Sequence, residues 1–264
     1  MTSAEKNANR FTGFAEVYDN ARPALPQHFI ELVRLYLGRE IGNVADLGCG
    51  TGLSTAAWKG HCKCVTGVEP SDDMLAIARS KECSGVSFIK GYSHNTGLPD
   101  CSMDAVVCSQ SFHWMEPVST LKEADRLLVS GGVFATVDCD WPPVCGTEPE
   151  CAYAELFAKV DKLQSEVPDI SSTFRRWEKS GHLANIRSSG QFRYVRELVF
   201  ANPEPFTAQR FINIAKSQGG LQTILKLHPE LIEDEWNEFQ RKVNECFGEP
   251  RMAEFCYRVR IGVK

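Results

Sequence analysis

The sequence lacks any run of about 18 consecutive apolar residues, the length that a transmembrane helix needs. We therefore expect no membrane partner. The N-terminal stretch MTSAEKNANRF also lacks the apolar segment of a secretory signal. These two absences together predict a cytoplasmic protein.

Positive charge is scarce relative to negative charge. The chain has 264 residues, with 29 Lys and Arg against 34 Asp and Glu, a formal net charge of −5. A nucleic-acid-binding domain usually carries a basic excess or a basic stripe, so we expect no nucleic-acid partner. The only locally basic stretch, RSSGQFRYVR (187–196), is better explained as a strand with solvated arginines.

Metal-binding spacings are absent despite eleven cysteines. No CxxC pair occurs, and no two histidines have the spacing of a metal site. HCKC (61–64) brings one histidine and two thiols together, but a tetrahedral site would need two more ligands from elsewhere. We expect no metal and free thiols in a reducing compartment. A thiolate site for a metal or for arsenic is the weaker alternative.

Short apolar segments alternate with amphipathic ones along the first 140 residues. Strands that are apolar throughout are typical of a parallel sheet buried on both faces, and residues 71–81 have the polar start and basic end of a helix. This alternation predicts an α/β fold, doubly wound, with a mostly parallel sheet and helices on both faces. The expected strands are 43–47, 62–69, 86–90, 104–110, 133–140, 192–200 and 255–263, and the expected helices are 53–59, 71–81, 118–129, 151–166, 204–217 and 231–247.

The segment DLGCGTG (46–52) places three glycines in five residues, directly after the first expected strand. A strand that turns through glycine into a helix presents backbone N–H groups and a helix N-terminus at the edge of the sheet. Glu69 lies 17 residues beyond Gly52, at the end of the second expected strand. A carboxylate there can accept hydrogen bonds from both hydroxyls of a ribose, so the two features predict a nucleoside cofactor.

The spacing of the glycines helps to identify the nucleoside cofactor. The dinucleotide fingerprint GxGxxG would need a third glycine where Leu53 stands, and no Gly-Lys-Ser/Thr follows, as a phosphate-binding P-loop requires. Asp46 is unfavourable beside a pyrophosphate but suits an ammonium or a sulfonium. A ribose, an amino group and a positive charge together indicate S-adenosylmethionine.

Five segments in the right order resemble class I S-adenosylmethionine-dependent methyltransferases of the small-molecule branch (methyltransferase domain family 11). The resemblance runs from about residue 8 to the end. It implies a Rossmann-like sheet of seven strands with a C-terminal strand pair, in a single domain over 1–264. The segments that carry it are YDNARPALP (18–26), VADLGCGTG (44–52), GVEPSDDML (67–75), LPDCSMDAVVCSQSFHW (98–114) and RLLVSGGVF (126–134).

The same resemblance divides that domain into three parts. Residues 1–40 would form an N-terminal helical cap, and 41–140 the cofactor-binding core. Residues 141–264 would form the acceptor side, with a helical insertion at about 200–250 that supplies the acceptor pocket and a lid.

The resemblance also implies roles for individual residues in binding S-adenosylmethionine. The glycines would approach the methionyl part, with Asp46 near its amino group and Glu69 on the ribose. Gln110 would face the methionine or the sulfonium, and Arg22 its carboxylate. A tight turn alone is the alternative for each glycine, and helix packing is the alternative for the cap residues. The implied cofactor-binding set is Tyr18, Arg22, Asp46, Gly48, Cys49, Gly50, Gly52, Glu69, Pro70, Met74, Ser93, His94 and Gln110.

The sequence departs from the family pattern after the third strand. Many members have Gly-x-Ala-Glu there, whereas this chain has GYSHN (91–95). We therefore expect backbone rather than side-chain contacts with the adenine near Ser93 and His94.

Methyl transfer depends mainly on holding the acceptor close to the methyl group and aligned with it. A general base is needed only where the acceptor carries a proton of high pKa, and His113 is the best candidate for that catalytic role. A packed structural histidine is the alternative. Asp138, Asp140 and Trp141 could line the acceptor pocket. Helical spacing favours core packing for most of the later aromatic residues, which are Phe174, Trp177, Phe206, Phe211 and Trp236.

These observations favour an enzyme that moves a methyl group from S-adenosylmethionine to an O, N or C atom of a small-molecule acceptor, leaving S-adenosylhomocysteine. We expect a monomer or a homodimer. SQSFHW stands where base or glutamine methyltransferases have an NPPY-like tetrad, which argues against those acceptors. A cofactor-binding protein without transfer activity, serving as a sensor or a partner subunit, is the alternative. A nicotinamide-dependent oxidoreductase is a third hypothesis.

Overall fold

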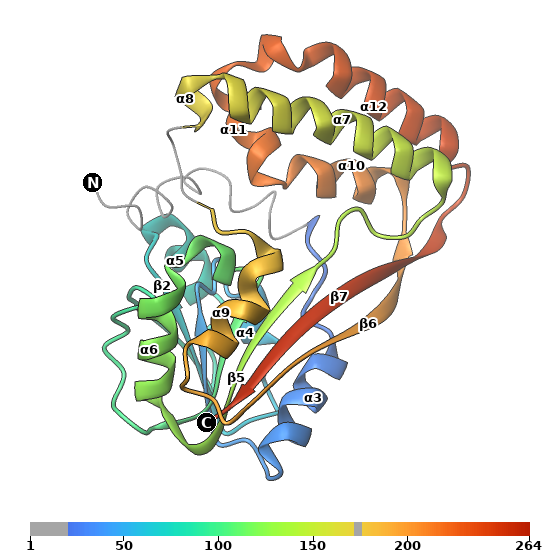
Figure 1. Ribbon diagram of the computed structural model, residues 1–264. Helices are drawn as coiled ribbons and strands as arrows, with labels where there is room; N and C mark the ends of the chain where they lie inside the picture. Colours follow the sequence, from blue (N-terminus) through green and yellow to red (C-terminus); the bar gives the residue numbers. More distant parts are fainter. Residues whose placement is uncertain (1–20, 172–175) are drawn as a thin grey trace.

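The computed structural model describes residues 21–171 and 176–264, and a single seven-stranded sheet lies at its centre (Figure 1). The strands occur in the order β3-β2-β1-β4-β5-β7-β6. Neighbours from β3 to β5 are parallel, whereas β7 is antiparallel to both β5 and β6. This confirms the predicted doubly wound, mostly parallel sheet with a C-terminal strand pair. The strands are β1 (Asn43–Leu47), β2 (Cys64–Glu69), β3 (Val86–Lys90), β4 (Met103–Ser109), β5 (Leu128–Cys139), β6 (Tyr194–Phe206) and β7 (Arg251–Val263).

Helices cover both faces of the sheet. Alternate residues of the central strands belong to two separate apolar clusters, because side chains of a strand point to opposite faces in turn. Ala105 of β4 packs in the cluster that contains Phe29, and Val106 packs in the one that contains Leu121. The helices of the first face are α3 (Gln27–Leu37), α4 (Leu53–Ala56) and α5 (Asp72–Arg79), and those of the second are α6 (Pro117–Leu127) and α9 (His182–Ser188).

A separate lobe of helices stands beyond the carboxyl end of β5 (Figure 1). It is assembled from two insertions, one between β5 and β6 and one between β6 and β7. Phe211 and Phe239 are buried in its centre, as helical spacing predicted for Phe211, and Trp236 packs against them at the edge. The sequence predicted that residues 141–264 form the acceptor side, but it indicated the acceptor pocket and lid only for an insertion at about 200–250. The lobe consists of α7 (Thr147–Glu166), α8 (Pro168–Ser171), α10 (Ala208–Lys216), α11 (Gly219–Leu227) and α12 (Glu233–Cys246).

The boundaries of the two insertions differ from the prediction. Residues 204–206 belong to β6 and not to a helix, and the strand tolerates Pro203 and Pro205 because it lies at the sheet edge. The helix begins after Thr207, whose Oγ1 accepts the N–H of Arg210 at 3.1 Å. The sequence pattern missed α9 and α11, both of which are short.

The start of β5 also differs from the prediction. The expected helix 118–129 and strand 133–140 left Gly131 and Gly132 between them, but β5 begins at Leu128 and includes both glycines. Gly131 has φ +75°, and the register between β4 and β5 shifts at this point. The glycines therefore shape a bulge in the strand.

Two further observations concern the described residues. All eleven cysteines lie among them and are free thiols. Within residues 21–171 and 176–264, no helix is both long and apolar enough to span a bilayer.

Candidate functional site

A cavity of about 1080 Å³ opens at the carboxyl ends of the parallel strands, beneath the helical lobe. Ligands of open α/β sheets bind at this edge. One end of the cavity is lined by the turns that follow β1, β2 and β3, and we call it the cofactor end. The other end is lined by α7, the turn between α10 and α11, and β7, and we call it the acceptor end. A pocket for one drug-sized molecule measures about 300–1000 Å³, so two small molecules can share this space.

The three loop glycines have positive φ angles, but their surroundings differ. A Cβ on Gly48 would lie 2.6 Å from the Met115 side chain, and one on Gly52 would lie 2.6 Å from the Phe88 ring. A Cβ on Gly50 would meet nothing within 4 Å. Gly48 and Gly52 are thus required by packing, whereas Gly50 borders open space in the cavity.

The Glu69 carboxylate ties the loop to the next helix. Its Oε2 accepts the N–H of Gly50 and its Oε1 accepts the N–H of Ser71, both at 2.9 Å. Burial raises the pKa of Glu69 to about 7, against the lowering effect of these two hydrogen bonds. The sequence predicted Glu69 at this place, and it does line the cofactor end.

Asp46 lies beneath the loop and does not line the cavity. Its Oδ2 accepts hydrogen bonds from Ser54 Oγ at 2.6 Å and Thr55 Oγ1 at 2.7 Å, which fix the start of α4. Its Oδ1 is buried and has no hydrogen-bond partner among the described residues, and burial raises the pKa of this carboxyl to about 6. The predicted contact with a cofactor amino group stays a prediction.

Five further predicted cofactor-binding residues line the cofactor end of the cavity. Ser93 Oγ lies 2.9 Å from Thr120 Oγ1, which holds the third-strand turn against α6. Tyr18 lies outside the described residues. The predicted residues that line this end are Cys49, Pro70, Met74, Ser93 and His94.

Gln110 stands at the middle of the cavity with an unusual backbone. Its φ is +56°, a conformation that non-glycine residues adopt rarely and mostly at functional sites. Its N–H donates to Val137 O at 2.9 Å, and its Oε1 accepts from Lys179 Nζ at 3.3 Å. The left-handed residue therefore turns the chain at the end of β4 and places the amide against a cation.

Asp138 is the centre of a buried charged cluster below the cavity. Lys179 Nζ lies 3.1 Å from its Oδ1, and Arg260 donates to its Oδ2 at 2.7 Å. His113 Nδ1 is 3.6 Å from Oδ1, and His182 Nδ1 is 3.3 Å from Oδ2. These groups hold the pKa of Asp138 well below its usual range in spite of burial.

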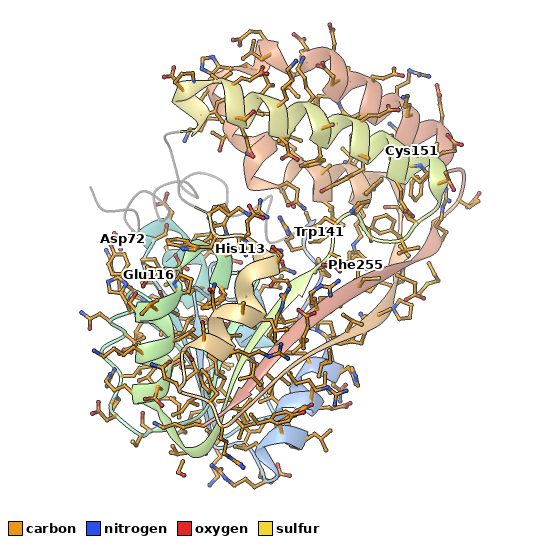
Figure 2. The ribbon with its side chains drawn as sticks, viewed as in Figure 1. Asp72, His113, Glu116, Trp141, Cys151 and Phe255 are labelled. Carbon is orange, nitrogen blue, oxygen red and sulfur yellow. The ribbon has the colours of Figure 1, made fainter. Side chains whose placement is uncertain are left out.

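His113 lines the cavity beside this cluster. Figure 2 shows it, with Trp141, at the end of the sheet that faces the helical lobe. Burial lowers the pKa of His113 to about 3, more than the neighbouring carboxylate of Asp138 raises it. The imidazole is therefore neutral at physiological pH.

Arg22 lies at the acceptor end. Its Nε donates to Ser217 Oγ at 2.9 Å, and its guanidinium lies 4.7 Å from the centre of the Trp141 ring. A second bond runs to Gln218 Oε1 at 3.2 Å. The arginine thus joins the start of the described chain to the lobe, and its predicted contact with the cofactor carboxylate stays a prediction.

Of the three predicted acceptor-pocket residues, Asp140 and Trp141 line the cavity and Asp138 lies below it. Trp177 also lines the cavity, although helical spacing favoured core packing for most of these aromatics; Phe174 lies outside the described residues. Sequence reasoning missed the side chains that only the tertiary fold brings here. These are Tyr153, Phe157, Gln164, Arg176, Lys179, Tyr257 and Arg258.

Comparison with known proteins gives a consistent result. Residues 45–136 match a family described as "Methyltransferase domain". An uncharacterised methyltransferase of Mycobacterium tuberculosis is 31% identical over 138 residues, which is 52% of this chain and 55% of that protein. The chain therefore spans about half the length of the mycobacterial relative. An uncharacterised methyltransferase of Bacillus cytotoxicus is 26% identical over 200 residues, covering 72% of this chain and 92% of the relative.

The solved structures show the same fold. A protein of Anaeromyxobacter dehalogenans, assigned as a type II methyltransferase, superposes with a TM-score of 0.69 at 19% identity. The superposition covers 92% of this chain and 97% of that one. The two proteins therefore share the fold over most of their lengths.

Proposed function

We propose that this chain, which belongs to the class I S-adenosylmethionine-dependent methyltransferases, moves a methyl group from that cofactor to a small-molecule acceptor. One observation carries the proposal. A single cavity of about 1080 Å³ joins the glycine loop and Glu69 to a pocket lined by residues of the helical lobe. Both reactants can therefore lie in one space, which is the main requirement of a direct transfer.

The residues of the cofactor end fit S-adenosylmethionine, which supplies an electrophilic methyl group on a sulfonium. The open space at Gly50 admits the close approach of a ligand to the loop backbone. The Glu69 carboxylate can accept hydrogen bonds from two ribose hydroxyls, and Pro70 and Met74 form an apolar slot beside it. Gln110 would face the methionyl part.

The acceptor end can orient a molecule and exclude water. Trp141, Tyr153 and Phe157 offer aromatic surface, and Tyr153 stacks on Phe157 with ring centres 4.2 Å apart. With an acceptor bound, these aromatic side chains would exclude water from the reacting atoms. The acceptor atom would be an O, N or C that lies close to Gln110.

His113 would contribute a fixed polar contact more than a strong base. A histidine whose pKa is lowered to about 3 is a weak base at neutral pH. We therefore assign it to orienting the acceptor; its Nδ1 lies 3.6 Å from Asp138 Oδ1.

Two measurements test this function. Calorimetry should show binding of S-adenosylhomocysteine and none of NAD, because the loop lacks the dinucleotide spacing. Incubation with methyl-labelled cofactor and a small-metabolite extract should then transfer label to a compound of low mass. Binding of S-adenosylhomocysteine with no labelled product from any extract would instead favour the binding protein without transfer activity.

A further inference from the structure

Lys179 supplies a cation at the junction of the two ends of the cavity. Its Nζ lies 3.1 Å from Asp138 Oδ1 and donates to Gln110 Oε1 at 3.3 Å. The side chain is only 22% exposed, and the residue lines the cavity. An ammonium has three N–H groups, and within residues 21–171 and 176–264 these two contacts are its only polar ones. One N–H is thus available to a ligand next to Gln110.

Two arginines and one carboxylate are the charged groups that most affect the protonation of Lys179. Burial lowers the pKa of Lys179 most, Asp138 raises it, and Arg176 and Arg22 lower it further. All three cations line the cavity, whereas Asp138 does not. A positively charged cofactor bound beside them would add to this excess, which a negative ligand would offset.

The carboxylates nearby do not cancel the excess. Asp138 is already shared with Arg260, and Asp140 lies 3.3 Å from Arg258. Asp161 and Glu178 are exposed, and so is Arg176, so water screens all three of these charges. An amine acceptor, protonated at neutral pH, would meet repulsion at this place.

We propose that the acceptor carries a carboxylate, that Lys179 binds it beside Gln110, and that the product is a methyl ester. This inference rests on the proposed function and narrows it to one acceptor class. The body of the acceptor would lie against Trp141, Tyr153 and Phe157, which favours an apolar or aromatic molecule.

The chemistry balances without a base. A carboxylate oxygen provides the electron pair of the new O–CH3 bond, while the electrons of the S–CH3 bond stay on sulfur. One negative and one positive charge disappear together, and no proton moves. The low proton affinity of His113, whose pKa is about 3, is no disadvantage for such an acceptor.

A binding experiment tests the inference without turnover. Phenylacetate, phenylacetamide and phenethylamine are similar in size and differ in charge, and each is titrated into the protein saturated with S-adenosylhomocysteine. We expect phenylacetate to bind at least about tenfold more tightly than the other two, the range of a charge-assisted hydrogen bond. Equal affinities, a preference for the amine, or no detectable binding of phenylacetate would overturn the inference.

Variants then assign the effect to Lys179. Lys179→Met should weaken phenylacetate about tenfold or more, and Lys179→Arg should stay within about threefold of wild type. Lys162→Met removes an exposed lysine of α7 outside the cavity and should change nothing. If Lys179→Met does not fold, the ligand preference of the wild-type protein and the phenylacetate affinity of Lys179→Arg still test the inference. An unchanged phenylacetate affinity in a folded Lys179→Met protein would contradict the assignment.

Product analysis separates this inference from the proposed function. A labelled product that releases methanol in mild base is a methyl ester and supports both. A base-stable label on nitrogen or carbon would keep the function and overturn the carboxylate. Bound cofactor with no labelled product from any acceptor would overturn the function itself.

Discussion

The two ends of the cavity are built in different ways. The cofactor end consists of backbone groups and short turns that follow consecutive strands, all between residues 48 and 94. The acceptor end consists of side chains from Arg22, α7, residues 176–179, the α10–α11 turn and β7. The first is specified by local sequence, whereas the second exists only once distant segments have packed together.

Because of this difference, the two ends of the cavity should tolerate different amino-acid substitutions. A ligand held by the loop backbone depends on glycine at particular φ angles, which few substitutions preserve. A pocket made of side chains on an inserted lobe can change residue by residue while the sheet remains intact. We therefore expect substitutions at the two ends to have separable effects, and Asp138, which lies between them, to affect the whole protein.

The largest effect should come from Asp138→Asn. It leaves Arg260 and Lys179 without their shared buried carboxylate, and breaking a buried pair costs about 3–5 kcal/mol of unfolding free energy. At about 2–4 °C per kcal/mol, the melting temperature should fall by roughly 6–20 °C in a thermal scan. Asp140→Asn, on a half-exposed pair with Arg258, is the control and should cost about 1 kcal/mol or less. Equal losses in both variants would show that the Asp138 cluster is not structural.

Gly50→Ala should come next and should affect only the cofactor end. The new methyl group points into open cavity space, so the fold should survive while S-adenosylhomocysteine binds about 100-fold more weakly in calorimetry. Gly190→Ala is the matched control, because Gly190 also has a positive φ (+70°) with open space around it but does not line the cavity. Normal affinity in Gly50→Ala would mean that the ligand does not touch the loop.

Glu69→Gln should weaken S-adenosylhomocysteine by about 10–100-fold, because the amide cannot accept hydrogen bonds with both of its terminal atoms. The amide also leaves one of the backbone N–H groups of Gly50 and Ser71 without an acceptor, at a cost of about 1–3 kcal/mol, so the melting temperature should fall by roughly 2–12 °C. Lys179→Arg, at the junction, is the comparison and should leave this affinity within about threefold. An effect of Lys179→Arg as large as that of Glu69→Gln would show that substitutions at the two ends of the cavity do not have separable effects.

The pH dependence of binding should show the smallest change. The pKa of Glu69 is about 7 in the free protein, and ribose hydroxyls donate to the deprotonated carboxylate. Lowering the pH through 7 protonates Glu69 and opposes binding, so the affinity for S-adenosylhomocysteine should fall about tenfold between pH 8 and pH 6. Glu69→Gln should remove this dependence. A flat profile for the wild-type protein would show that binding does not require the Glu69 carboxylate.

The difference between the two ends of the cavity also explains which features could be predicted from the sequence. The mostly parallel sheet, the glycine loop and the place of Glu69 follow from short patterns, since strand ends of a parallel sheet meet at one edge. The position of Lys179 follows from no pattern, because a short 3-10 turn after α8 brings it to Asp138, 41 residues away in sequence. The sequence likewise did not predict that Asp46 is buried and accepts hydrogen bonds from Ser54 and Thr55, since these two look like ordinary helix residues.

A crystal structure with S-adenosylhomocysteine tests the central claim most directly. The account predicts that the ribose hydroxyls lie on Glu69, the methionyl chain follows Gly48–Gly50, and the sulfur faces the space beside Gln110 and Lys179. Density for the ligand at any other place, or with its sulfur turned away from the acceptor end, would contradict it.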